Sequence, residues 1–96
     1  MQGESGMAHI VRDKVKLLGR IRRIQGQTAA LEEQLAEGRD CIGVLQQIAA
    51  IRGAVNGLMV AVINGHLVDH VVKEPKLKQR QQDLDVVLQV LKSYLK

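Results

Sequence analysis

Core-facing residues recur at helical spacing along most of this 96-residue chain and predict three helices. In the first, between Ile10 and Glu37, they follow steps of three, four and seven, so they stay within a stripe about 80° wide at about 100° per residue. The members of this stripe are Ile10, Leu17, Ile21, Ile24, Thr28, Leu31 and Leu35. Gly38 then predicts the end of the helix, and Asp40 is a suitable N-cap for the next one.

The second predicted helix is long, covering about residues 41–72, or about 48 Å at about 1.5 Å per residue. It contains Gly53, Gly57 and Gly65, each of which costs about 1 kcal/mol relative to alanine in a helix interior. Ala49, Gly53 and Gly57 lie four apart, so they line one face with small side chains. We interpret this face as a place where another helix crosses closely. The alternative is that the helix merely tolerates its glycines.

Pro75 ends the second helix because proline cannot continue it. A third helix is predicted from about Gln79 to Leu95, with Asp83 and Asp85 near its start and Lys92 near its end, as the helix dipole favours. Its apolar stripe contains Leu84, Val87, Leu88, Leu91 and Leu95. Because this helix is about half as long as the second, the excess of the second helix must pack against another copy of the chain.

Composition restricts the fold class to all-α. The chain has one aromatic residue, Tyr94, and one threonine, Thr28, whereas the strands of a small sandwich or barrel normally draw on both kinds. A core without Phe or Trp is thin, and small chains of this type often need partners to bury enough surface. We therefore expect one domain over residues 9–96, an N-terminal extension at residues 1–8, native or left from expression, and an oligomer.

The net charge of +4 and the isoelectric point near 9.6 are compatible with a polyanionic partner. A single cysteine, Cys41, excludes an internal disulfide and fits a reducing compartment. No uninterrupted apolar run reaches the about 18 residues of a membrane span, and the N-terminal residues lack the pattern of a signal peptide. We expect a cytoplasmic protein that does not enter a membrane.

Basic residues form a second stripe on the first helix. Arg12, Lys16, Arg20 and Arg23 follow steps of four, four and three, and Arg22 adds charge on the flank. A solvated helix face is one interpretation, and a surface for the phosphates of double-stranded DNA is the other. An oligomer would repeat the charge in every copy, which favours DNA. No helix-turn-helix pattern is evident, and the lack of aromatics argues against stacking on single strands.

Cysteine and histidine supply candidate metal ligands. His66 and His70 are four apart, which places both on one helix face, and Cys41 falls on the same face 25 residues before His66. That separation is about 37 Å along a straight helix, so the thiol and the imidazoles of one chain cannot meet. They can meet across an antiparallel pair of second helices that cross near Val55, which would create two equivalent sites. His9, just before the first helix, is by itself an ordinary surface residue.

At these residues the chain resembles the CsoR/RcnR family of metal-sensing repressors. The resemblance covers almost the whole chain from Ala8 onward, and its most specific stretches are RIRRIQGQ at 20–27, LQQIAAIRGAVNGLM at 45–59, INGHL at 63–67 and DLDVVLQVLKSYLK at 83–96. It implies an all-helical protomer, an antiparallel dimer and a flat, disc-shaped homotetramer. It also implies that the protein binds operator DNA and that an effector releases it.

The resemblance also indicates the effector. Nickel- and cobalt-sensing members use an early histidine, a central cysteine and a His-x-x-x-His pair, and this chain matches them with His9, Cys41, His66 and His70. Such a nitrogen-rich set with one thiolate suits Ni(II) or Co(II) better than Cu(I). In these members the amine of the N-terminal residue is a further ligand; here Ala8 would supply it only if translation starts at Met7. Other effectors of the same scaffold, namely Cu(I), Zn(II) or formaldehyde, remain alternatives.

The resemblance ranks Arg20 and Arg23 first among the DNA contacts, ahead of Arg12, Lys16 and Arg22. Two further residues border the metal site, Asp40 and Asp69, which could tune it or contribute oxygen ligands; for Asp40 a role as helix cap is expected instead. For Arg52 we expect a buried or interface ion pair. A metal-binding helical bundle without DNA binding is the alternative from another class. An enzyme is not expected, because no nucleophile with an adjacent base is visible.

Overall fold

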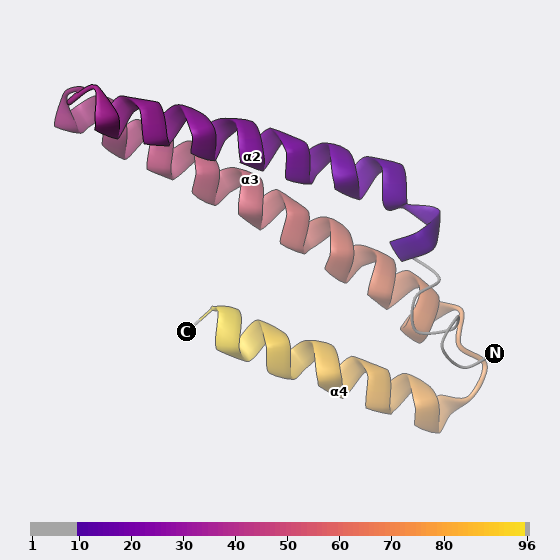
Figure 1. Cartoon of the computed structure of the whole chain (residues 1–96). Helices are drawn as coiled ribbons and strands as arrows, with labels where there is room; N and C mark the ends of the chain where they lie inside the picture. Colours follow the sequence, from indigo (N-terminus) through magenta and orange to yellow (C-terminus); the bar gives the residue numbers. More distant parts are fainter. Residues whose placement is uncertain (1–9, 96) are drawn as a thin grey trace. The chain divides into compact units, whose positions relative to one another are not determined.

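The computed structural model describes residues 10–95, and this part of the chain is helical without any strand. Three α-helices and one π-helical segment follow one another in the order α2 (Lys14–Ala36), α3 (Cys41–Leu67), η1 (Val68–Val72) and α4 (Leu77–Tyr94), as Figure 1 shows. The expected all-α fold class is confirmed. The expected dimer and tetramer are not tested by a single chain and stay predictions.

The first helix is shorter than predicted. Residues 10–12 are helical, but a turn at Asp13 separates them from α2, which begins at Lys14. Aspartate is a poor residue inside a helix because its carboxylate competes for nearby hydrogen-bond donors. Here the carboxylate accepts hydrogen bonds from the Arg12 guanidinium. The expectation of one unbroken helix from Ile10 to Glu37 is therefore wrong at this point.

The end of α2 and the start of α3 follow the predicted local signals. Gly38 has φ +68°, the Gly38 N–H donates to the Leu35 carbonyl at 3.2 Å, and the Arg39 N–H donates to the Gln34 carbonyl at 2.9 Å. This pair of bonds is the Schellman arrangement, which needs a left-handed residue at the position of Gly38. The Asp40 carboxylate then accepts from the Gly43 N–H at 3.0 Å and caps α3, as predicted.

The described residues form two compact units, of which one is Lys14–Val60 and the other combines residues 10–13 with residues 61–95. In the first unit α2 runs beside the first part of α3 (Figure 1), and the Gln47 amide donates to the Gln27 carbonyl at 3.0 Å. A Cβ at Gly57 would lie 3.0 Å from Arg20 Nη1, whereas nothing lies within 4 Å at Gly53. The contact at Gly57 is thus made by the end of the Arg20 side chain, and a close helix crossing by a second copy stays a prediction.

In the second unit α4 packs against η1. Val87 of α4 is the only buried hydrophobic side chain among the described residues, at 6% exposure. Large apolar side chains of α3 remain exposed, including Leu45 at 55% and Val60 at 64%. The thin core expected from the composition is confirmed.

Helix α4 begins at Leu77, two residues earlier than predicted. Its first turn therefore contains no acidic residue, and the expected role of Asp83 and Asp85 at the positive end of the helix dipole is wrong. Lys92 lies in the last turn, as predicted.

The stretch Cys41–Val72 forms 32 helical residues with a mean hydropathy of 1.5 over its most apolar window, and 6% of that window is buried. By length and composition alone it is sufficient to cross a membrane, although no uninterrupted apolar run is that long. A helix that packs its apolar faces against other protein passes the same test. One such helix is therefore weak evidence for a membrane span.

Candidate metal site and nucleic-acid surface

Two histidines lie side by side in the second unit. His66 is the penultimate residue of α3 and His70 lies in η1, and their ring centroids are 4.7 Å apart at an angle of 46°. His70 is buried at 6% exposure, and His66 is half-buried. The predicted proximity of the two rings is confirmed, while metal binding by them stays a prediction.

The backbone around His70 is a π turn rather than a regular α-helix. The Lys73 N–H donates to the Val68 carbonyl at 3.0 Å, five residues back. The predicted end of the helix near Val72 is correct, but the wider turn changes the direction in which His70 projects. Apolar periodicity cannot distinguish the two kinds of turn. Single π turns of this kind occur frequently at functional sites.

Asp83 of α4 is a third residue of this cluster that the sequence interpretation missed. Its Oδ2 lies 3.9 Å from His70 Nδ1, and its backbone carbonyl lies 3.2 Å from His66 Nε2. One signal was present, because Asp83 precedes the buried Val87 by four residues and so shares its face of α4. A carboxylate that accepts a hydrogen bond from a metal-binding imidazole orients the ring and selects its tautomer. At 3.9 Å the Asp83 carboxylate is near His70 but not hydrogen-bonded to it, so this role stays a prediction.

Cys41 is the first residue of α3 and is exposed. Its neighbour Asp40 is engaged as the helix cap, so its carboxylate has a structural role. His66 lies on the same helix 25 residues later, which corresponds to about 37 Å at about 1.5 Å per residue. The structure therefore does not bring the thiol to the histidine pair within α3. His9, the remaining predicted ligand, lies outside the described residues.

The side chains present fit part of a site for a borderline divalent ion. Two imidazole nitrogens on adjacent rings are donors of the type that Ni(II) and Co(II) accept, and a thiolate is compatible with both. Within residues 10–95, no group of three His, Cys, Asp or Glu side chains is placed to hold one ion. One chain thus supplies a histidine pair and a distant thiol, and a complete set of ligands needs donors from elsewhere.

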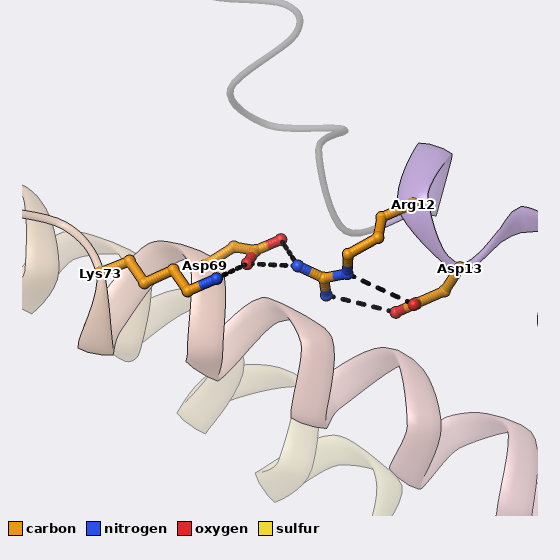
Figure 2. Close-up of polar contacts among 4 residues, drawn as sticks. All are labelled: Arg12, Asp13, Asp69 and Lys73. Atoms are coloured by element: carbon orange, nitrogen blue, oxygen red, sulfur yellow. Dashed lines mark hydrogen bonds and ion pairs between the residues drawn. The ribbon is translucent and has the colours of Figure 1, made fainter.

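Arg12 lies at the centre of a network of ion pairs beside the histidine pair. Figure 2 shows its guanidinium between two carboxylates, those of Asp69 and Asp13. Arg12 Nη1 donates to Asp69 Oδ1 at 2.7 Å and to Oδ2 at 3.0 Å, and its Nε and Nη2 each donate to Asp13 at 3.3 Å. Lys73 Nζ lies 4.0 Å from Asp69 Oδ1. The hydrogen bonds to Asp13, and then those to Asp69, raise the pKa of Arg12 above its ordinary value.

The other predicted DNA contacts lie on α2 and have a different environment. Lys16, Arg20, Arg22 and Arg23 are all exposed, and none of the ion pairs among the described residues includes them. A row of exposed cations without acidic partners is available to phosphate groups. Arg52 is also exposed and has no ion pair in this part of the chain, so the expected buried ion pair is wrong within the chain, and an interface pair stays a prediction.

Comparison with known proteins relates this arrangement to a regulatory family. The profile of the family described as metal-sensitive transcriptional repressor matches residues 13–93. The transcriptional repressor RcnR of Escherichia coli K12 is 58% identical over 90 residues, which cover 94% of this chain and all of that protein. RcnR of Salmonella paratyphi B is 57% identical over the same lengths.

A solved structure shows the same fold. A variant of the formaldehyde-responsive regulator FrmR from Salmonella enterica serovar Typhimurium matches with a TM-score of 0.78 and 44% sequence identity. The match covers 86% of this chain and 94% of that one.

Proposed function

The chain belongs to the family of metal-sensitive transcriptional repressors, and on this premise we propose that it senses Ni(II) or Co(II) and thereby controls the efflux of these metals. As a repressor it is not an enzyme. The observation that supports the effector is the histidine pair on α3 and η1 together with Cys41 on the same helix. The sequence motif of a central cysteine followed by a His-x-x-x-His pair resembles that of the nickel- and cobalt-sensing members of this family.

We propose that His9, Cys41, His66 and His70 hold the ion, with Cys41 from one protomer and the histidine pair from another. The length of α3 between Cys41 and His66 supports this division, since one helix cannot fold back on itself. The exposed apolar side chains of α3 support an antiparallel dimer, because burying them against a second α3 is favourable. Two such dimers would form the tetramer.

We propose that operator double-stranded DNA binds the exposed basic residues of α2, with Arg20 and Arg23 as the main contacts and Lys16 and Arg22 beside them. Binding of Ni(II) or Co(II) stabilises one arrangement of the tetramer, and operator affinity falls if DNA prefers another arrangement. As a DNA-bound regulator, the protein is expected in the cytoplasm.

The second candidate is the same scaffold with another effector. The specific observation is the 44% identity to FrmR, which is named as formaldehyde-responsive. Cu(I) and Zn(II) belong to the same alternative. A repressor that responds to formaldehyde, Cu(I) or Zn(II) would still use the basic surface of α2 but would release DNA on binding a different effector.

Operator binding measured with and without effector tests the proposal. A duplex selected by the protein from a random-sequence pool is titrated in the presence of Ni(II), Co(II), Zn(II), Cu(I) or formaldehyde. We expect Ni(II) and Co(II) to weaken binding most, by about 5- to 150-fold for a typical allosteric coupling. Unchanged operator affinity with Ni(II) fully bound contradicts the proposal, and a response to formaldehyde alone supports the second candidate.

A further inference from the structure

We propose that Arg12 and Asp69 form a latch that joins the residues before α2 to η1, and that Arg12 acts in the effector response through this latch rather than as a phosphate contact. The inference rests on the proposed function, because it assigns a positioning residue to the step between metal binding and DNA release. It changes the role expected for Arg12 from its place in the basic stripe.

The latch is a close contact between distant parts of the sequence. Arg12 and Asp69 are 57 residues apart, and a single nitrogen, Nη1, donates to both carboxylate oxygens of Asp69 at 2.7 and 3.0 Å (Figure 2). The Asp69 side chain is 9% exposed, so its carboxylate is largely removed from water and held by its partners. Charge-assisted bonds to such a carboxylate are stronger than bonds between neutral groups.

The charges of this cluster argue against a phosphate contact. Among the described residues of this cluster, the positive charges of Arg12 and Lys73 are balanced by the negative charges of Asp13 and Asp69. All three nitrogens of the guanidinium donate to carboxylates. A phosphate approaching Arg12 would have to displace a carboxylate, whereas Lys16 and Arg20 have no acidic partner among the described residues.

The latch lies between the two functional parts of the chain. Asp69 directly precedes His70, and both belong to η1. Arg12 lies two residues before Lys14, where α2 and its basic residues begin. Any movement of η1 caused by an ion on His70 is therefore passed through the Asp69 carboxylate to the segment that leads into α2.

A double-mutant cycle tests the latch on the full-length protein with Ni(II) as the probe. Operator affinity with and without Ni(II) is measured for the wild type, Arg12→Ala, Asp69→Asn and the double variant. We expect each single variant to reduce the Ni(II)-induced loss of affinity by about fivefold or more, and the double variant to reduce it no further. The charge-swapped variant Arg12→Asp with Asp69→Arg should recover part of the response.

The ligand-field absorption of bound Ni(II) is expected to stay unchanged in these variants, which separates a positioning role from loss of the metal site. Arg39→Ala is the matched control, because Arg39 also pairs with a carboxylate, that of Glu37, but both are exposed and far along the chain from the histidines. It should respond to Ni(II) as the wild type does.

The opposite result is that Arg12→Ala weakens operator binding without metal, whereas Asp69→Asn does not. In that case Arg12→Ala would also reduce the slope of log operator affinity against log salt concentration by the amount expected for one phosphate contact. That outcome overturns the latch and restores Arg12 as a DNA contact. Hydrogen exchange of the amides of residues 10–13, measured without metal, tests the latch independently of the proposed function. If wild-type operator affinity ignores bound Ni(II), the proposed function fails. Equal and non-additive acceleration of exchange in the two variants still supports the latch, and unchanged exchange overturns it.

Discussion

The imidazole of His70 is buried, although its proposed role is to bind a metal ion. At 6% exposure its ring is held by packing between His66 and α4, with Asp83 3.9 Å from its Nδ1. A ring oriented in this way loses little conformational entropy when it binds an ion, because its rotamer is already selected. If the proposed site is correct, the buried histidine pair should bind an ion more tightly than two exposed histidines at the same spacing.

We predict that His70→Ala abolishes the response of operator binding to Ni(II). The substitution removes one of the two adjacent imidazole rings, and His66 without His70 cannot chelate the ion. Binding isotherms with Ni(II) and with formaldehyde measure the effect; if the second candidate is correct instead, a formaldehyde response should survive the substitution. A variant that still releases operator DNA on binding Ni(II) would contradict the assignment of His70.

We predict that Asp83→Asn lowers Ni(II) affinity by about 10- to 100-fold, the usual effect of removing a group that orients a metal-binding histidine. Competition with a coloured chelator measures the affinity. Asp85→Asn is the matched control, because Asp85 is an exposed acid on the same helix. Equal effects of the two substitutions would indicate a general loss of negative charge rather than an orienting role.

Some element boundaries of this chain are set by local bonds, and others occur where helices pack against each other. Gly38 and Asp40 act within one turn of their own helices, through a positive φ and a capping bond of 3.0 Å. The π turn of η1, in contrast, occurs where α4 packs against the helix. Element boundaries set by local bonds are expected to survive changes in oligomeric state, and η1 is the element that an ion on His70 would affect first.

We predict that Asp40→Ala destabilises the protein by about 1 kcal/mol, because the Gly43 N–H loses its acceptor. Gly38→Ala should cost about 1–2 kcal/mol, since alanine is strained at φ +68°. Urea unfolding at one fixed protein concentration measures both, and Glu32→Ala on the exposed face of α2 is the control. A neutral Asp40→Ala variant would show that the cap contributes nothing.

We predict that Arg20→Ala and Arg23→Ala each weaken operator binding and each reduce the slope of log affinity against log salt concentration by about 0.9. Both residues are exposed on α2 without an acidic partner in the described chain. Fluorescence anisotropy over a salt series provides the slopes, with Arg39→Ala as the control. Unaltered slopes would exclude Arg20 and Arg23 as phosphate contacts, and a wild type that binds no duplex would support a metal-binding bundle without DNA binding.

At the scale of the whole molecule, one chain is incomplete in two respects. Val87 is the only buried hydrophobic side chain of the described residues, and α3 exposes large apolar residues such as Ile48 at 46%. The donors of the proposed metal site are also divided, with Cys41 at one end of α3 and His66 at the other. The proposed second copy, packed antiparallel along α3, would meet both deficits.

We predict that mixing two inactive variants restores metal binding. Cys41→Ala and His70→Ala each damage both sites of a homodimer, but a mixed dimer contains one site with both substitutions and one intact site. Joint unfolding and refolding of the two variants followed by Ni(II) titration should therefore recover about a quarter of the wild-type sites, by random pairing of copies in a symmetric dimer. No recovery would show that the ligands come from a single chain.

Local sequence signals were enough to predict the three helices approximately, the Gly38 and Asp40 boundaries and the proximity of His66 and His70, because each depends on bonds or spacings within a few residues. Periodicity could not foresee the break at Asp13, the π turn or the place of Asp83 and Asp69. The places of Asp69 and Asp83 depend on side chains brought together from distant segments, as the 57 residues between Arg12 and Asp69 illustrate. The break at Asp13 accompanies bonds from its neighbour Arg12 that apolar periodicity does not register. Arg12 has the same helical spacing as the other basic residues, but the folded chain places the carboxylates of Asp13 and Asp69 against its guanidinium. This pairing could not be predicted from the sequence, because it follows distance in space and not position along a helix face.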